Sequence, residues 1–356
     1  MKVLILVSGY PSKENLYNCS WAHTRSLQYL KNGIYPIVVN FGIKTHYKID
    51  EINVHPASDI DKILSNNEFS ILIMHSPNIR NHFPLCMKIS ENFNKILIFC
   101  HGTESMWINK DYPEPYNFMK DNFFKQKVRN LYDLLKFIYF RFFIKKYKNK
   151  LEIIFVSSWM KNIFKKNVLD PDLLNVKNHI ISNTIHPAFL ELNYNPDAVK
   201  YDFITIRRFD DSKYAVDLVV NMAIKNPSRT FHIYGKGNYF LYNEKPANVE
   251  IFEKFIKQDE IPTLLNQYKC ALMPTRCDAQ GVMVCEMATY GVPVITTDIE
   301  INQNMLTGFN NVYLLNEKKF NSKINFDFEY KDADKNIRFN LPNTVDLEIG
   351  LLKSSL

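Results

Sequence analysis

Short apolar runs alternate with amphipathic stretches along the first half of the chain. Residues 2–7, 71–74 and 95–100 are almost continuously apolar, which is typical of strands buried on both faces of a parallel sheet. Residues 23–32 carry apolar side chains at helical spacing and end at Gly33, a residue that commonly follows a helix. This pattern predicts an α/β fold in which strands and helices take turns.

The same alternation returns in the second half of the chain. Residues 202–206, 229–234 and 270–274 predict strands, and residues 216–222 predict a helix, so the order is again strand, helix, strand. At 356 residues and 46% hydrophobic composition, the chain can bury two cores of ordinary domain size. We therefore expect two doubly wound α/β domains.

Two carboxylates lie eight positions apart around a predicted helix start. Asp278 precedes Gly281, a helix is expected from about Val282, and Glu286 follows one turn inside it. The first N–H groups of that helix, on Val282 and Met283, would face the carboxyl end of a strand, where open α/β sheets bind ligands. An anion site is the prediction, and the alternative is that the acids only cap and solvate an ordinary βαβ unit.

This stretch resembles the E-x7-E motif of retaining GT-B glycosyltransferases of the glycosyltransferase family 4 type, including the Gly-x-Pro-Val-Ile run at 291–295. The resemblance implies that Asp278 lies by the donor sugar and that Glu286 holds the ribose of the nucleotide. The chain departs from the motif because Asp stands in place of the first Glu. A misplacement of about 1 Å can cost about 100-fold in rate unless the loop compensates.

A charged turn after the strand at 202–206 strengthens the resemblance. It is similar to the family's Gly-Arg-Leu-x-x-x-Lys-Gly segment, which implies that Arg208 and Lys213 neutralise the donor diphosphate. Arg207 and Tyr214 occupy positions where the family usually has glycine. By itself the segment would be read as an exposed charged turn.

Other segments carry weaker resemblances. The turn at His101 resembles the family's His-Gly turn, which implies that His101 binds a sugar hydroxyl or lies beside the departing bond, whereas His75 is expected to be structural. Residues near Ile256 match the segment that lines the base pocket in the family. The family's paired glycines are missing at 18–23, so the acceptor pocket is expected to differ.

The resemblance implies a GT-B fold, in which two Rossmann-like doubly wound domains face each other across a cleft. Residues 1–187 would form the N-terminal acceptor domain and residues 188–342 the nucleotide-sugar donor domain. A C-terminal helix within 343–356 would cross back onto the first domain.

Positive charge gathers in one segment. The chain has a formal net charge of +7, and residues 120–150 hold ten Lys and Arg against Asp121 and Asp133, interleaved with aromatic residues. Such a helix can lie at an anionic membrane surface, from which a polyprenyl-linked acceptor could be reached, or it can pack its aromatics on the first domain. No nucleic-acid-binding module is present, so nucleic acid is not an expected partner.

The cysteine positions and the hydropathy of the chain indicate the cellular compartment of the protein. The longest apolar runs are too short to span a membrane, and the six cysteines form no C-x-x-C pair. Reduced core cysteines indicate a cytoplasmic protein, with the inner face of the membrane as a possible site of peripheral contact. No metal site is predicted, and no cofactor is expected beyond a UDP- or GDP-linked sugar as substrate.

The sequence therefore predicts a metal-independent retaining glycosyltransferase that builds a surface polysaccharide such as capsule or O-antigen. A same-face substitution, in which the cations stabilise the leaving diphosphate, is preferred over a double displacement with Asp278 as nucleophile. Two alternatives stay open: a nucleotide-sugar epimerase of the same fold, and a catalytically silent subunit that binds glycan or a partner.

Overall fold

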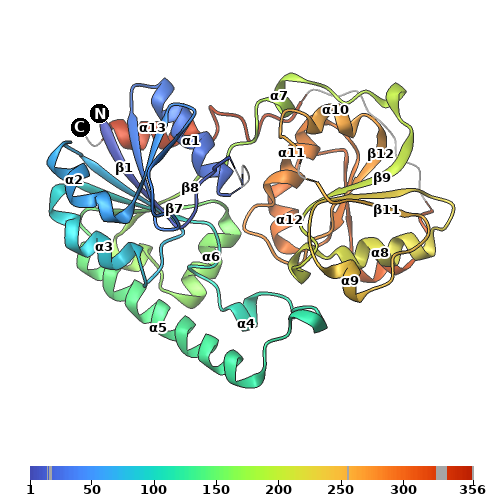
Figure 1. Cartoon of the computed structure of the whole chain (residues 1–356), viewed down its shortest axis with the longest axis horizontal. Coiled ribbons are helices and arrows are strands. Elements are labelled where there is room, and N and C mark those ends of the chain that lie inside the picture. The colour runs from blue at the N-terminus through green and yellow to red at the C-terminus, as the bar shows by residue number, and fades with distance from the viewer. Residues whose placement is uncertain (14, 16–17, 255, 326–334, 355–356) are drawn as a thin grey trace. The chain divides into compact units, whose positions relative to one another are not determined.

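The chain folds into two compact units, which Figure 1 shows in a computed structural model. The structure describes residues 1–13, 15, 18–254, 256–325 and 335–354. The first unit consists of Met1–Ile108, Val128–Thr184 and Leu341–Leu356, and the second of Asn109–Lys127 and Ile185–Asn340.

An eight-stranded sheet forms the centre of the first unit, in the order β3-β4-β2-β1-β5-β6-β7-β8. All neighbours are parallel except β3 and β4. The strands are β1 Lys2–Val7, β2 Tyr35–Asn40, β3 Tyr47–Ile49, β4 Ile52–Pro56, β5 Ile71–His75, β6 Lys95–Cys100, β7 Leu151–Phe155 and β8 Lys177–Ile180. The strands predicted from the continuous apolar runs are confirmed, and their burial on both faces explains those runs.

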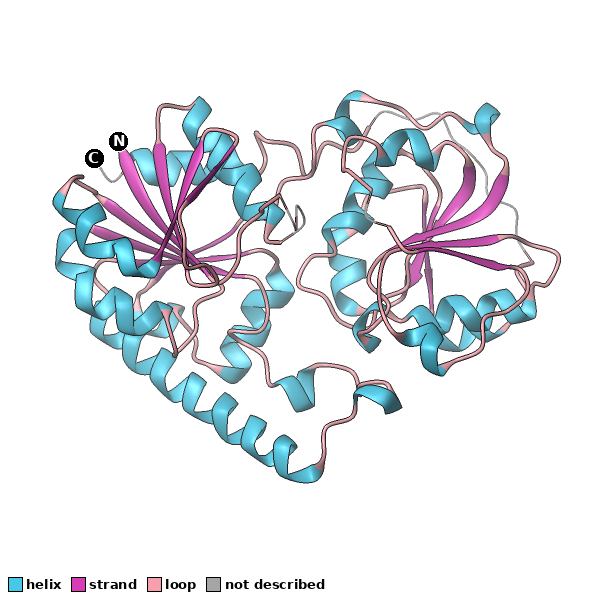
Figure 2. Cartoon of the chain, in the orientation of Figure 1, coloured by secondary structure: helices cyan, strands magenta, loops and turns pink. Residues whose placement is uncertain are grey.

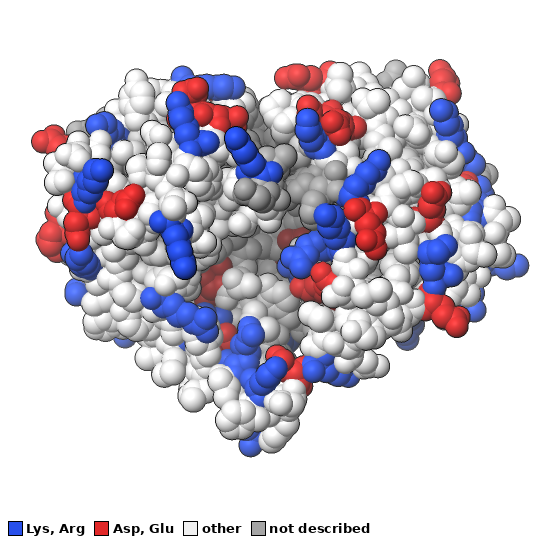
Figure 3. Space-filling view, in the orientation of Figure 1, with Lys and Arg blue, Asp and Glu red and all other residues white. Residues whose placement is uncertain are grey.

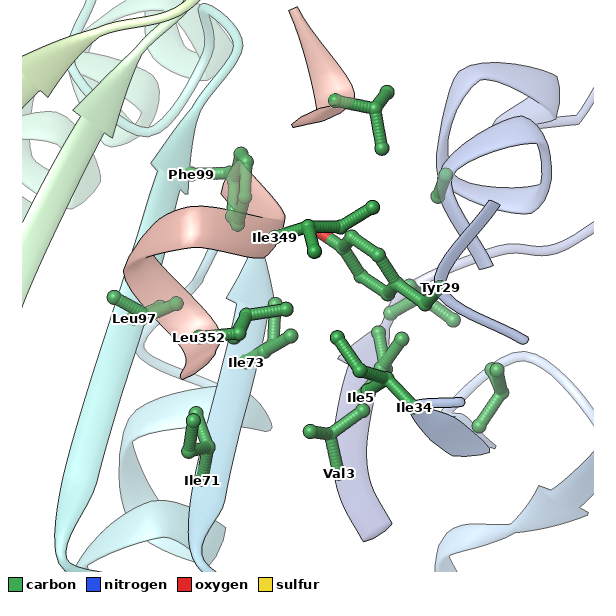
Figure 4. Close-up of a cluster of buried hydrophobic side chains, with 14 of the residues drawn as sticks. Val3, Ile5, Tyr29, Ile34, Ile71, Ile73, Leu97, Phe99, Ile349 and Leu352 are labelled. Atoms are coloured by element: carbon green, nitrogen blue, oxygen red, sulfur yellow. The ribbon is translucent and has the colours of Figure 1, made fainter. Parts of the chain in front are cut away.

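Helices cover the sheet of the first unit on both faces (Figure 2). They are α1 Ser20–Lys31, α2 Ile60–Ser65, α3 His82–Ile89, α5 Phe123–Tyr147, α6 Ser158–Asn167 and α13 Val345–Lys353, and α4 Ile108–Asp111 lies where the chain passes into the second unit. Ile349 and Leu352 of α13 pack with Tyr29 of α1 over the strand residues Ile73 and Leu97 (Figure 4). The last helix of the chain thus completes the core of the first unit.

A six-stranded, fully parallel sheet forms the second unit, in the order β11-β10-β9-β12-β13-β14. Its elements are β9 Tyr201–Ile206, α8 Val216–Lys225, β10 Phe231–Tyr234, α9 Tyr239–Tyr242, β11 Val249–Phe252, α10 Ile261–Leu265, β12 Tyr268–Leu272, α11 Val282–Tyr290, β13 Val294–Thr297, α12 Glu300–Met305 and β14 Val312–Leu315, with α7 Ala188–Glu191 before them. The strand order reverses between β9 and β12, and open α/β sheets bind ligands at such a reversal.

The prediction of two doubly wound α/β domains is confirmed, since each unit is a parallel sheet with helices on its faces. Residues 109–127 lie in the second unit, although they fall within the range predicted for the first domain. Aromatic contacts explain their position: the Tyr116 ring lies 5.0 Å from that of Tyr239, and Phe118 stacks on Tyr242 at 4.7 Å. Within the described residues, no helix is long and apolar enough to cross a bilayer.

Candidate functional site

Two loops meet where the strand order of the second sheet reverses. One follows β9 and carries Lys213, and the other follows β12 and begins near Thr275. The Lys213 carbonyl oxygen accepts a hydrogen bond from the Arg276 N–H at 2.8 Å and another from the Thr275 hydroxyl at 2.9 Å. These bonds hold the two loops together at the carboxyl ends of adjacent parallel strands.

Two cations and one carboxylate share this corner. Burial alone would lower the pKa of Lys213, but its electrostatic interactions with Tyr214, Asp278 and Asp211 outweigh burial and raise that pKa above its ordinary value. Burial lowers the pKa of Arg207 to about 10, and Asp278 again opposes the change. Both side chains are therefore charged at neutral pH and lie within the electrostatic reach of Asp278.

Arg207 and Arg208 point to different surroundings. The Arg207 guanidinium donates to the carbonyl oxygen of Tyr214 at 2.9 Å and to that of Pro274, and among the described residues its buried Nε has no hydrogen-bond partner. The Arg208 side chain is 66% exposed and lies 3.3 Å from Asp210. Sequence reasoning missed Arg207, because that position is a glycine in the resembled motif; a role for Arg208 stays a prediction.

Glycines at 235 and 237 allow the β10 loop to approach the β9 loop. A methyl group on Gly235 would lie 1.9 Å from the Arg207 carbonyl oxygen, and one on Gly237 would lie 2.7 Å from the Asp210 nitrogen. Only residues without a Cβ fit at this spacing. Gly235 and Gly237 thus have a packing role, which is to support the backbone around Arg207.

The helix start predicted at Val282 is confirmed by α11. Gly281 adopts a left-handed φ of 69° before the helix, and its carbonyl oxygen accepts hydrogen bonds from the N–H groups of Val284 and Cys285 at 2.9 and 3.1 Å. The first N–H groups of an α-helix, here those of Val282 and Met283, have no acceptor within the helix. They give this end of α11 the partial positive charge that binds anions.

Glu286 is the most deeply buried carboxylate of the second unit's candidate site, at 1% exposure. Its Oε1 accepts hydrogen bonds from the His186 N–H at 3.0 Å and from Gln258 Nε2 at 3.2 Å. Its Oε2 is buried with no partner among the described residues. Burial raises the pKa of Glu286 to about 7, although the His186 bond opposes the change. An oxygen left in this state suits a ligand that donates a hydrogen bond.

A cavity of about 420 Å³ lies at the chain segment that the resemblance assigned to the base. It is lined by Lys254, Ile256, Asp259, Glu260, Thr263, Leu264 and Gln267. Ile256 is 7% exposed and sits two residues before Gln258, the partner of Glu286. The neighbouring Phe255 lies outside the described residues.

In the first unit, His101 belongs to a cluster of rings at the carboxyl ends of β5 and β6. Its Nε2 lies 3.2 Å from Nδ1 of His75, and the Trp21 ring stacks on it with centroids 3.8 Å apart. Burial, the neighbouring imidazole and the charge of Arg25 lower the pKa of His101. Both imidazoles are therefore neutral at physiological pH, so His101 can donate or accept a hydrogen bond without carrying charge.

In the portion of the chain that the structure describes, no group of three or more His, Cys, Asp or Glu side chains is arranged to hold a metal ion. All six cysteines are unpaired thiols.

Part of the second unit is similar to a known protein family. Residues 193–327 match the family model of glycosyl transferases group 1. The matched residues include Arg207, Lys213, Asp278 and Glu286, whereas His101 lies outside the match. No curated protein matches the chain by sequence.

Solved structures share the fold of the whole chain. Sucrose-phosphate synthase from Thermosynechococcus elongatus matches with a TM-score of 0.65 at 9% identity, over 90% of this chain and 87% of that one. A glycosyltransferase from Rickettsia africae ESF-5 matches with a TM-score of 0.64 at 15% identity, over 99% of this chain and 98% of that one.

A third structure is a mutant of S. aureus TarM in complex with fondaparinux, α-GlcNAc-glycerol and UDP. It matches with a TM-score of 0.56 at 12% identity, over 90% of each chain. These likenesses show a GT-B fold, and together with the family match they support glycosyl transfer as the activity.

Proposed function

We propose that the protein is a retaining glycosyltransferase that moves a sugar from a UDP- or GDP-linked donor to a glycan or lipid-linked glycan in surface polysaccharide biosynthesis. The observation that carries the proposal is the buried Oε2 of Glu286 in α11, which has no hydrogen-bond partner in the part of the chain that the structure describes. A nucleoside diphosphate presents the matching groups, since its ribose donates hydroxyl hydrogens and its diphosphate is anionic. Ile256 would line the base pocket, as the resemblance implies.

The positive groups suit the leaving diphosphate. Lys213 and the N–H groups of Val282 and Met283 would bind its oxygens, and Arg207 and Arg208 would contribute from the β9 loop. Positively charged groups held in place before the reaction stabilise the charge that develops on the leaving group. With these groups neutralising the diphosphate, the proposed reaction requires no metal ion.

The proposed chemistry is a same-face substitution. An acceptor hydroxyl oxygen forms a bond to the anomeric carbon while the bond from that carbon to the diphosphate oxygen breaks, and the hydroxyl proton passes to the departing oxygen. Asp278 would orient the sugar, because it is already engaged with the Ala279 N–H at 2.7 Å and with the two cations of this corner. For His101 the resemblance implies a sugar hydroxyl as the ligand.

Donor binding and donor turnover test the proposal. UDP and GDP are titrated into the wild type by calorimetry, and release of the nucleoside diphosphate from UDP- and GDP-sugars is followed with and without glycan acceptors. We expect binding, and its loss in Lys213→Ala and Glu286→Ala, with Lys225→Ala, at an exposed lysine in the last turn of α8, as the matched control. A chain that neither binds nor releases a nucleoside diphosphate contradicts the proposal, and a donor converted to its epimer without transfer identifies an epimerase.

We also propose that α5 binds the anionic lipids at the inner face of the cytoplasmic membrane. This would place the protein next to lipid-linked acceptors. Its solvent side carries an apolar stripe at alternating spacings of three and four residues, each side chain 50% to 57% exposed: Val128, Leu131, Leu135, Ile138 and Phe142. The opposite face, through Phe137, Phe140 and Phe143, is buried in the first unit. Packing on the unit therefore leaves this stripe uncovered.

The charged residues around this apolar stripe favour an anionic lipid surface as its partner. The exposed cations Arg129, Lys145 and Lys146 flank it, whereas the helix's only acid, Asp133, is buried 2.7 Å from Lys136. In Figure 3 the edge formed by α5 is mostly uncharged, with Lys and Arg near it. A second copy of the chain would bring like charges together, whereas an anionic lipid surface gains about 1 kcal/mol per nearby Lys or Arg.

Vesicle sedimentation tests the docking. We expect the wild type to bind vesicles of phosphatidylglycerol but not of phosphatidylcholine, and to lose binding in Leu131→Gln with Ile138→Gln and in Lys145→Gln with Lys146→Gln. Leu173→Gln, which changes an exposed leucine elsewhere in the same unit, should bind as the wild type does. Equal binding to both lipids, or a dimer in solution that Leu131→Gln dissociates, would contradict the proposal that α5 binds a membrane.

A further inference from the structure

Residues 109–127, which we call the strap, belong to the second unit, although the chain segments directly before and after them belong to the first unit. Contacts between aromatic rings hold the strap on the second unit. Tyr116 meets Tyr239 edge to face, and Phe118 stacks on Tyr242 with the two ring planes only 7° apart. Tyr116 and Phe118 also pack against the main apolar core of this unit. The strap is therefore an integral part of the second unit.

A chain of hydrogen bonds links the strap to the Lys213 loop. The Tyr116 hydroxyl donates to Oδ1 of Asp217 at 2.7 Å. Both oxygens of Asp217 accept hydrogen bonds from the Arg276 guanidinium, at 2.8 and 2.7 Å, and the Arg276 backbone N–H donates to the Lys213 carbonyl oxygen. Although its burial opposes ionisation, the Arg276 bonds lower the pKa of Asp217, so this link is charged at neutral pH.

The anchored strap presents Tyr112 to the ammonium group of Lys213. The Lys213 Nζ lies 5.7 Å from the centre of the Tyr112 ring and 4.7 Å from that of Tyr214. A lysine ammonium within about 6 Å of a ring face is attracted by the ring. The lysine side chain is a flexible four-carbon chain. Attraction to two rings therefore restricts the positions that its ammonium group can occupy.

We infer that Tyr112 is a positioning residue for Lys213, and that the strap thereby completes the diphosphate site of the second unit. The inference rests on the proposed function only for the identity of the ligand that Lys213 binds. The alternative is that the strap only covers apolar surface, in which case Tyr112 would have no influence on the Lys213 ammonium. The two readings differ in what happens when the ring alone is removed.

The first experiment needs no ligand. Lysines are reductively methylated with ¹³C-formaldehyde, and the Lys213 signal is identified by its absence in Lys213→Arg. Ring currents should displace that signal from those of exposed lysines in the wild type and in Tyr112→Phe. In Tyr112→Leu the signal should move toward the exposed position, with Tyr35→Leu, at an exposed tyrosine of the first unit, as the control. An unchanged Lys213 signal in Tyr112→Leu overturns the inference.

The second experiment measures the consequence for binding. Losing one cation–π contact should weaken UDP or GDP binding about fivefold in Tyr112→Leu, while Tyr112→Phe, which keeps the ring, binds as the wild type does. Should Tyr112→Leu fold poorly by thermal unfolding, Tyr112→Gln removes the same ring with a polar side chain suited to a half-exposed site. Wild-type protein that binds no nucleoside diphosphate contradicts the proposed function, whereas the Lys213 signal still decides the role of Tyr112.

Discussion

Glu286 has a carboxylate whose two oxygens have different surroundings, and this asymmetry is what makes it a binding group. Oε1 is held by His186 and Gln258, so the side chain is oriented before any ligand arrives, while Oε2 is buried without a partner among the described residues. Leaving a buried acceptor unpaired costs about 1–3 kcal/mol, which a ligand hydroxyl would recover. The folded chain is thus less stable, and better prepared to bind, than it would be with a satisfied residue there.

Replacing Glu286 by glutamine tests both consequences. We expect Glu286→Gln to weaken binding of UDP or GDP about tenfold to 100-fold, since a hydrogen bond to a charged group contributes about 1.5–3 kcal/mol. Calorimetric titration measures this loss. A change of less than about twofold would remove Glu286 from the site.

The same variant should alter the pH dependence of stability. The folded-state pKa of Glu286 is raised from 4.5 to about 7, so the buried group favours its neutral form and the folded chain loses stability as pH rises from about 4.5 to about 7. Glutamine cannot ionise. Relative to the wild type, Glu286→Gln should therefore gain unfolding free energy between pH 5 and pH 7.5, as measured by urea denaturation. A constant difference across that range contradicts the raised pKa.

Glycine 235 offers a residue-scale test of the loop geometry. Alanine there would place its Cβ 1.9 Å from the Arg207 carbonyl oxygen, and we expect Gly235→Ala to destabilise the chain by about 2–4 kcal/mol. Gly350→Ala is the matched control, because nothing lies within 4 Å of the added methyl and the site is inside helix α13. That change should stabilise by about 0.5–1 kcal/mol in chemical denaturation. Similar effects of the two substitutions would refute the close approach at Gly235.

At the scale of elements, a buried ionic cluster fixes helix α13 to helix α1. Arg25 Nε donates to both oxygens of Glu348 at 2.9 and 3.1 Å, and the Tyr29 hydroxyl donates to Glu348 Oε2 at 2.8 Å. Arg25 also donates to the Asn183 side chain at 2.8 Å. This cluster joins the end of the chain to a segment near the exit from the first unit, and the apolar side chains of α13 then close the core.

A double-mutant cycle should show how strongly the cluster depends on both charges. Removing one partner of a buried pair leaves the other charge uncompensated, so Glu348→Leu should cost about 3 kcal/mol or more of unfolding free energy. Arg25→Leu with Glu348→Leu should cost less than either single change, because both buried charges are gone. Loss of the exposed Lys48–Glu51 pair should change stability by less than about 0.5 kcal/mol. Additive effects at Arg25 and Glu348 would show that the pair is not coupled.

The elements differ in how far their sequence reveals them. Continuous apolar runs predicted β1, β5 and β6, and Gly281 predicted the start of α11, because burial on two faces and a left-handed backbone each demand particular residues locally. The sequence did not reveal that the strap packs in the second unit, since its position depends on contacts such as Phe118 with Tyr242, 124 positions away. Likewise the burial of Arg207 within the electrostatic reach of Asp278, and the exposure of Arg208, depend on side-chain directions that no spacing encodes.

At the scale of the whole molecule, two parallel sheets each have a strand-order reversal that can hold a ligand. In the first sheet the reversal lies at β1 and β5, near the ring cluster of His75 and His101, and in the second it lies at β9 and β12. The fold persists at 9% identity to a solved structure, so the architecture constrains sequence only through burial pattern and turn geometry. Which sheet binds the nucleotide must therefore be decided by side chains.

Hydrogen exchange with and without nucleotide assigns the donor to one sheet. At 100 times its dissociation constant, UDP or GDP should add about 2.7 kcal/mol of stability. We expect the added protection to concentrate in the loop that carries Lys213, at the start of α11 and around Ile256, because these segments supply the proposed contacts. The loops after β5 and β6 should change little with nucleotide alone, and Glu286→Gln should reduce the protection at the same concentration. Protection confined to the loops near His75 and His101 would instead assign the nucleotide to the first sheet, and the cations of the second would then need another ligand.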